Sequence, residues 1–124
     1  MRVLLDTHTL LWALSSSDRL PAEVRKLIHD AEVYASAASI WEISIKSSLG
    51  KLTADPMQVL DVIEPAGFSL LAISGAHAAK VKDLPALHKD PFDRMLVAQA
   101  LTEPMMLLTN DEALRGYGPF ISVF

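Results

Sequence analysis

Four acidic side chains in this sequence are of the type, and in the places, to bind a metal ion together. Asp6 ends a short apolar run, Asp111 closely follows another, and Glu42 and Asp93 each lie near the start of a stretch with helical periodicity. Four carboxylates gathered in one cleft would repel one another unless cations or protons intervened. Hard oxygen ligands, without cysteine or paired histidine, select Mg²⁺ or Mn²⁺ over zinc. Such a site supports hydrolysis of a phosphodiester bond by a metal-activated water.

Each of these acids also has a plainer explanation. Asp6 fits a turn at the end of a strand, and Asp111 fits a helix N-cap. Glu42 can pair with Lys46 four residues later, and Asp93 favours the positive end of a helix dipole. The residues alone leave open whether the acids form one metal site or have separate structural roles. The fold decides between the two, because only a metal site requires the carboxylates to lie close together.

The stretch His88–Ala100 carries the most informative of these positions. Pro91 suits the first position of a helix, and Asp90 directly before it can cap the free backbone N–H groups. Asp93 then falls in the first turn, on the same helix face as Val97, which is expected to point toward the core. A carboxylate that points inward needs a partner.

Short apolar runs alternate with segments of helical periodicity along the chain. We expect strands at residues 2–7, 33–35, 68–73, 105–109 and 121–124, with helices between them. This alternation predicts an α/β fold: a single domain over residues 1–124, with a central parallel sheet of about four or five short strands and helices on both faces. In such sheets ligands bind outside the carboxyl ends of the strands, and all four acids are expected on that side.

The composition narrows the class of protein. A chain of 124 residues fits one domain, and the lack of cysteine excludes disulfides, thiolate zinc sites and cysteine nucleophiles. Apolar residues make up 51% of the chain, yet no run approaches the roughly 18 apolar residues of a membrane span. We therefore expect a cytoplasmic protein without membrane contact, whose apolar surplus covers a partner surface. The net charge of −4 argues against a broad basic surface for coating nucleic acid, although bound metal could neutralise the acids of a nuclease.

The basic residues give weaker signals. Three cations lie near the acids in the sequence, namely Lys46, Lys51 and Arg94. They could hold an RNA backbone or balance the charge of the acids, or they could be solvated helix ends. Among the histidines only His8, two residues after Asp6, is a candidate for proton transfer. The four histidines share no metal-like spacing, and two of them are expected on helix surfaces, namely His29 and His77.

Four motifs follow one another in order along nearly the whole chain. They are Asp6-Thr7 after an apolar run, Trp41-Glu42-Ile43 followed by Gly50-Lys51-Leu52, the stretch His88–Ala100, and Leu108-Thr109-Asn110-Asp111. Together they resemble the successive motifs of PIN domains and, more narrowly, those of the VapC-type toxins of toxin–antitoxin pairs.

This resemblance implies a Mg²⁺-dependent endoribonuclease, with Mn²⁺ as the other suitable ion. Asp6 and Asp93 would be the leading metal ligands, and Glu42 and Asp111 would complete the set of catalytic residues, with Asp111 either touching the metal or holding water beside it. Asp90 competes with Asp93 for the third family position, and we prefer Asp93 because its spacing to the following apolar residues fits the family helix. The resemblance also implies an RNA substrate, a homodimer, a cognate antitoxin whose tail enters the acidic cleft, and contact with DNA only through that antitoxin.

Two other functions are compatible with the same acids. One is a non-catalytic α/β protein-binding module whose acidic cleft receives a basic peptide. The other is a small phosphatase that uses the metal pocket on a monoester, although no nucleophile motif supports it. The chain has no Gly-x-Ser-x-Gly elbow and no glycine-rich phosphate loop, so serine hydrolysis and nucleotide binding have no motif behind them.

Overall fold

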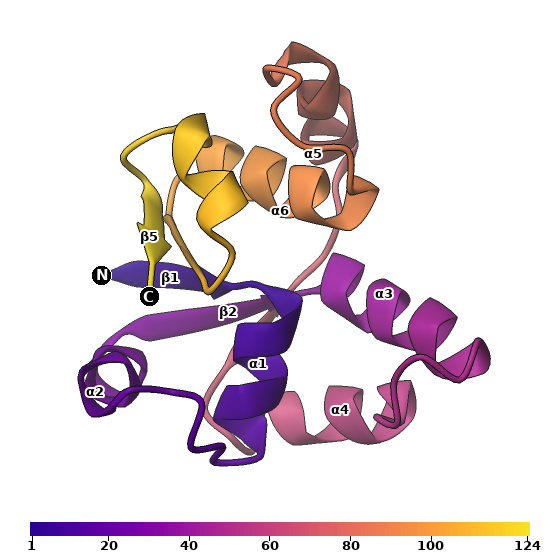
Figure 1. The fold of residues 1–124 in the computed structure, drawn as a ribbon, viewed down its shortest axis with the longest axis vertical. Coiled ribbons are helices and arrows are strands. Elements are labelled where there is room, and N and C mark those ends of the chain that lie inside the picture. The colour runs from indigo at the N-terminus through magenta and orange to yellow at the C-terminus, as the bar shows by residue number, and fades with distance from the viewer.

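A parallel sheet of five strands runs through the middle of the protein (Figure 1). The computed structural model describes residues 1–124, and its strands lie in the order β3-β2-β1-β4-β5. Every pair of neighbouring strands is parallel. The α/β fold expected from the sequence is therefore confirmed. The strand bounds are β1 (Arg2–Leu5), β2 (Glu32–Ser36), β3 (Ser69–Leu71), β4 (Met106–Thr109) and β5 (Ile121–Val123).

Helices connect the strands, and most begin where the sequence supplies a cap. Asp55 and Asp90 each cap a helix whose first residue is a proline, Pro56 and Pro91. The longest helices have 12 residues, and none combines the length and the apolar character that crossing a membrane requires. The helix bounds are α1 (Thr7–Leu14), α2 (Ala22–Asp30), α3 (Ala37–Ser48), α4 (Pro56–Ile63), α5 (Gly75–Lys80) and α6 (Pro91–Thr102), with the 3₁₀ helices η1 (Val81–Asp83) and η2 (Glu112–Tyr117).

Four expected strands are longer than the observed ones, two of them by two residues or more and the other two, at residues 105–109 and 121–124, by a single residue. The strand expected at residues 2–7 ends at Leu5, because the Asp6 side chain accepts a hydrogen bond from the backbone N–H of Thr9 and so caps α1. The strand expected at residues 68–73 is only Ser69–Leu71, since β3 lies at the sheet edge and pairs with β2 alone. The apolar pattern locates a strand, whereas its ends depend on capping and on neighbours.

The three inner strands, β1, β2 and β4, contribute side chains to two cores, because successive side chains point to opposite faces of a sheet. In β1, Val3 and Leu5 pack in the core that α1, α2 and α4 cover, whereas Leu4 packs in the core under α6 and η2. Figure 1 shows α1 and α4 on one side of the strands and α6 with α5 on the other. Helix α3 joins the two layers, with Ile43 in the first core and Ala38 in the second. Helices thus cover both faces, as expected.

The carboxyl ends of β1 and β4 meet near the middle of the sheet. The backbone N–H of Asp6 donates to the carbonyl of Leu108 at 3.1 Å, which continues the pairing of the two strands into the start of α1. From β1 the chain builds the sheet toward β2 and β3, and it later returns to the other side as β4 and β5. A crevice opens at such a switch point, outside the strand ends. Asp6 directly follows β1, Asp111 comes two residues after the end of β4, and both flank this crevice.

Candidate active site

A pocket of about 280 Å³ opens at this edge of the sheet, and no apolar side chain lines it. It contains all four acids singled out from the sequence, which come from segments as far apart as residues 6 and 111. The structure therefore brings these carboxylates together, as the sequence predicts. The lining residues are Asp6, Thr7, His8, Glu42, Lys46, His88, Asp90, Asp93 and Asp111.

Asp6 is held at both carboxylate oxygens. The side chain is buried, and Oδ1 accepts a hydrogen bond from the backbone N–H of Thr9 at 2.9 Å. Oδ2 accepts a hydrogen bond from the hydroxyl of Thr109 in β4. These bonds tie the start of α1 to the end of the neighbouring strand, so the position and orientation of the Asp6 carboxylate are fixed by the fold.

Glu42 is equally well held, on the second turn of α3. It is 5% exposed, and Oε1 accepts a hydrogen bond from the Thr7 hydroxyl at 2.6 Å. Oε2 accepts from the ammonium of Lys46, and this hydrogen bond raises the pKa of Lys46 above its ordinary value. The ion pair with Lys46 and the place in the pocket, which the sequence left as alternatives, both occur.

Asp93 lies in the first turn of α6 and has no backbone donor to its carboxylate. Burial, as the largest cause, and the nearby carboxylates of Asp90, Glu42 and Asp6 together raise the pKa of Asp93 from 3.8 to about 6. The hydrogen bond from His88 Nε2 to Oδ2, at 2.9 Å, opposes this shift. Asp93 is thus the acid whose negative charge the surrounding protein compensates least.

Asp90 has a separate structural task. Its Oδ1 accepts hydrogen bonds from the backbone N–H groups of Phe92 at 2.9 Å and of Asp93 at 3.0 Å. This is the N-cap of α6 that the sequence predicts. Asp90 also lines the pocket and adds negative charge to it.

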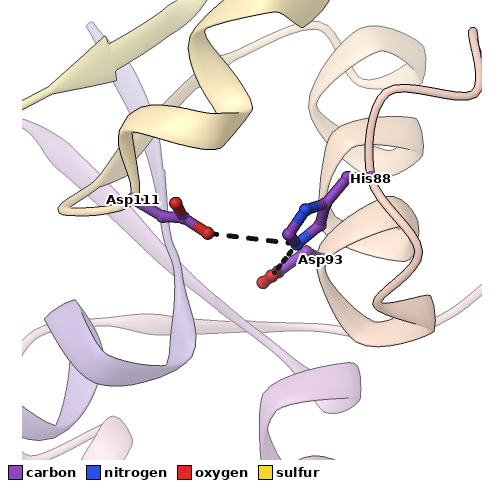
Figure 2. A group of neighbouring side chains, drawn as sticks. All are labelled: His88, Asp93 and Asp111. Atoms are coloured by element: carbon purple, nitrogen blue, oxygen red, sulfur yellow. Dashed lines mark hydrogen bonds and ion pairs between the residues drawn. The ribbon is translucent and has the colours of Figure 1, made fainter.

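Asp111 and His88 face Asp93 from two other segments. Asp111 caps η2 through the N–H of Ala113 at 3.0 Å, and its Oδ2 lies 3.9 Å from Nε2 of His88. Figure 2 shows the imidazole of His88 with dashed lines to both carboxylates, from Asp93 on α6 and Asp111 after β4. One ligand atom from each of these residues lies within 4.8 Å of the other two.

His88 is the pocket residue that sequence analysis missed. Spacing between histidines does not reveal it, since its neighbours in the pocket are carboxylates. The signal available in the sequence is its place five residues before Asp93, in the segment that leads into α6. His8, the histidine considered from the sequence, also lines the pocket, but its ring stacks on Trp12 with centroids 5.9 Å apart.

Two expectations about basic residues are wrong. His77 is not a surface residue: it is 2% exposed, its Nδ1 accepts from the backbone N–H of Ser74, and its Nε2 contacts Glu103. Arg94 is neither a solvated helix end nor free to hold RNA, because its guanidinium donates to backbone carbonyls of the segment before α6. Of the expected cations, Lys46 lies in the pocket and Lys51 is exposed outside it.

The residues present fit a divalent cation. Five carboxylates face one small polar space, and of the side chains that line it only Lys46 carries a permanent positive charge. Carboxylate oxygens are the ligands that Mg²⁺ and Mn²⁺ prefer. The raised pKa of Asp93 reports the same excess of negative charge, which a divalent ion would neutralise.

The fold is shared with solved structures of low sequence identity. A structure of VapBC2 from Rickettsia felis bound to a promoter DNA fragment matches with a TM-score of 0.71 at 16% identity, over 100% of this chain and 98% of that one. DNA-bound VapBC from Salmonella typhimurium matches at 0.65 and 20%, over 100% and 97% of the two chains. FitAcB from Neisseria gonorrhoeae matches at 0.65 and 17%, over 98% and 96%. At these identities the likeness shows the fold.

A comparison of the sequence with models of protein families identifies the family of this protein. A comparison with curated proteins gave no match. The model of the PIN domain, by contrast, matches residues 3–118, which include all of β1 except its first residue, the strands β2, β3 and β4, and all the acids of the pocket. Since that match spans far more than half of the chain, this protein belongs to the PIN domain family.

Proposed function

We propose that this protein is a divalent-metal-dependent endoribonuclease and the toxin of a toxin–antitoxin pair. The observation that carries the proposal is the pocket at the carboxyl edge of the sheet, where Asp6, Glu42, Asp93 and Asp111 converge without any apolar lining. Membership of the PIN domain family and the fold shared with toxin–antitoxin complexes support it. The proposed substrate would make the cytoplasm the place of action.

Asp93 and Asp6 are the proposed metal ligands, with Mg²⁺ or Mn²⁺ as the ion. The carboxylate of Asp93 is partly buried without a backbone donor, and Asp6 has a carboxylate fixed by two hydrogen bonds. Glu42 and Asp111 complete the catalytic set by orienting water and shaping the charge of the pocket. When bound, such an ion supplies activation of a water nucleophile and stabilises charge on the scissile phosphate.

The chain's own side chains would position the substrate and the ion. The hydroxyls of Thr7 and Thr109 hold the Glu42 and Asp6 carboxylates in place, so these groups need no reorganisation when the substrate arrives. Lys46 carries a positive charge at the rim of an otherwise acidic pocket and is the side chain available there to contact a phosphate oxygen. A polar pocket open to solvent suits an exposed phosphodiester backbone.

Cleavage of end-labelled RNA tests the function. The wild type should cut in the presence of Mg²⁺ or Mn²⁺ and stop in excess EDTA, and Asp6→Asn and Asp93→Asn should abolish cutting while remaining folded. Asp61→Asn, which removes an exposed carboxylate on α4, is the matched control and should leave cleavage unchanged. Cleavage that continues in excess EDTA or in Asp93→Asn contradicts the proposal. A folded protein that binds a basic peptide and never cuts RNA would favour the binding module instead.

We propose an antitoxin as the protein partner, with a basic tail that enters the acidic pocket. Two of the similar structures, of VapBC2 and VapBC, are bound to DNA, and an excess of carboxylates in this pocket would hold arginine or lysine side chains of a partner. With a net charge of −4, this chain would contact DNA through that partner. The expected partner is encoded by a short neighbouring reading frame, and its product should co-purify with this chain and suppress cleavage. Undiminished cleavage in that complex would contradict the pairing.

We also propose a homodimer that uses the outer face of α3. Trp41, Ile45 and Leu49 recur every four residues there and are exposed, with Trp41 the largest of them. Trp41 also lies edge-on to Phe92 at the start of α6. Sedimentation velocity should show a dimer for the wild type and a monomer for Trp41→Glu. A wild type that sediments as a monomer at high concentration would contradict the dimer.

A further inference from the structure

We infer that Nε2 of His88 is a direct ligand of the metal ion, so that the site is a mixed nitrogen and oxygen site that favours a transition-metal ion such as Mn²⁺ over Mg²⁺. The inference rests on the proposed function for the presence of an ion beside Asp93. It goes beyond that function because it changes the ligand set, and with it the preferred ion. Its starting point is the position of the imidazole between two carboxylates, which Figure 2 shows.

The spacing of the three side chains fits a shared ion. In an octahedral site with bonds of about 2.0–2.1 Å, adjacent ligand atoms lie about 3 Å apart and opposite ones about 4 Å apart. Nε2 of His88 lies 2.9 Å from Oδ2 of Asp93 and 3.9 Å from Oδ2 of Asp111. Nε2 of His88 therefore already lies at coordination-shell distances from both carboxylate oxygens. The three ligand atoms lie within 4.8 Å of one another and come from three different segments of the chain.

The segment that carries His88 is fastened to the rest of the domain. The guanidinium of Arg94 donates to the carbonyl of Pro85 at 2.9 Å and to that of Val81 at 3.1 Å, and also to the hydroxyl of Tyr117 at 3.1 Å. These bonds join the segment before α6 to η2, whose N-cap is Asp111. Ligand residues need such support to be useful, because an unsupported imidazole loses side-chain entropy when it binds. Arg94 is thus a positioning residue for His88.

A nitrogen ligand changes which ion the pocket prefers. Mg²⁺ is a hard ion that keeps oxygen ligands and several waters, whereas imidazole is a good ligand for first-row transition metals. The competing explanation for the same contact is that His88 only donates a hydrogen bond to Asp93 and orients it, without touching the ion. The two explanations differ in one measurable respect, namely whether a histidine nitrogen is bonded to the metal.

Electron spin-echo envelope modulation of bound Mn²⁺ distinguishes them without any RNA. With Mn²⁺ alone as the probe, the wild type should show ¹⁴N modulation, which becomes ¹⁵N modulation in protein labelled with ¹⁵N-histidine. His88→Gln should lose the modulation and bind Mn²⁺ at least about tenfold more weakly, with a much smaller change for Mg²⁺ in competition. His8→Gln is the matched control, because it removes the other pocket histidine and should retain the modulation.

The wild-type spectrum alone keeps the inference falsifiable if a variant fails to fold. Absence of nitrogen coupling in wild-type protein loaded with Mn²⁺, or coupling that survives in folded His88→Gln, overturns it. Failure of the proposed function is a different result: nitrogen-coordinated Mn²⁺ in a protein that never cuts RNA. Conversely, RNA cleavage that depends on metal, with no nitrogen coupling in the Mn²⁺-loaded protein, overturns the role of His88 alone.

Discussion

The acidic pocket has two halves that treat negative charge in opposite ways. In the inner half, Asp6 and Glu42 are 7% and 5% exposed, and their four carboxylate oxygens receive hydrogen bonds from two threonine hydroxyls, a backbone N–H and Lys46. In the outer half, the side chains of Asp93 and Asp111 are 21% and 43% exposed, and His88 is the side chain that faces both. Burial without backbone donors raises the pKa of Asp93 to about 6.

The difference assigns separate tasks to the two halves. Buried carboxylates that are fully hydrogen-bonded keep their geometry whether or not an ion is present. A carboxylate with a raised pKa is poorly compensated, and a cation bound beside it relieves that cost. The inner half therefore keeps its carboxylates in fixed positions. A metal ion is stabilised most in the outer half, where the negative charge is least compensated.

Loss of the Asp93 carboxylate should have the largest effect on activity. Because a metal ion contributes several kcal/mol to stabilising the transition state, Asp93→Asn should lower RNA cleavage by about 10³-fold or more at saturating Mg²⁺ or Mn²⁺. Single-turnover cleavage of labelled RNA measures the loss. If Asp93→Asn retains a tenth of wild-type activity, the assignment of the outer half to metal binding is wrong.

The pH dependence of the free energy of unfolding should reveal the uncompensated charge of Asp93 in metal-free protein. Below its ordinary pKa of 3.8, Asp93 is protonated in both the folded and the unfolded state. As the pH rises from about 4 to about 6, the unfolded state ionises first, so the free energy of unfolding should fall, by about 3 kcal/mol for a shift of about two pH units.

Denaturant unfolding in EDTA at several pH values isolates this contribution as the difference between wild type and Asp93→Asn. The variant should lack the fall and should be the more stable protein at pH 7. Equal pH profiles for the two proteins would show that Asp93 carries no uncompensated charge.

Removal of a hydrogen-bond donor from the inner half should lower the stability of the metal-free protein, whereas Asp93→Asn should raise it at pH 7. Thr109→Val deletes the hydroxyl that donates to Asp6 Oδ2 and accepts from the N–H of Asp111, so it should destabilise the metal-free protein by about 1–3 kcal/mol. Thr109→Ser keeps the hydroxyl and serves as the control. A Thr109→Val protein as stable as wild type would remove the distinction between the halves.

Substitution of Lys46 should have the smallest effect on stability. Lys46→Met leaves Oε2 of Glu42 without its cation, which should destabilise the metal-free protein by about 1 kcal/mol and increase its affinity for Mn²⁺. Thermal unfolding with and without Mn²⁺ measures both, and Lys51→Met, outside the pocket, is the control. Weaker Mn²⁺ binding by Lys46→Met would contradict the view that Lys46 already neutralises part of the pocket.

The sequence predicts this fold well because its signals are local and mutually consistent. Apolar runs such as Val3–Leu5 identify buried strands, and Asp90 with Pro91 identifies the start of α6. The ends of the strand at residues 68–73 could not be predicted, since they depend on pairing with a single neighbour. Capping at Asp6 likewise shortened the first expected strand by turning Thr7 into the start of a helix.

The acids of the site were predictable for a similar reason, and the surrounding residues were not. Asp6 directly follows β1 and Asp111 comes two residues after β4, so the topology brings them to one edge of the sheet. His88 lies in an irregular segment, and its direction depends on how Arg94 binds that segment. The buried place of His77 depends on a contact with Glu103, 26 residues away, which no periodicity reports.

Anomalous scattering from Mn²⁺-soaked crystals shows whether a metal ion binds beside Asp93. We expect a peak within about 2 Å of a carboxylate oxygen of Asp93, in the pocket that Asp6, Glu42 and Asp111 share. A pocket that shows no peak at saturating Mn²⁺, or an ion bound only elsewhere on the protein, would contradict it.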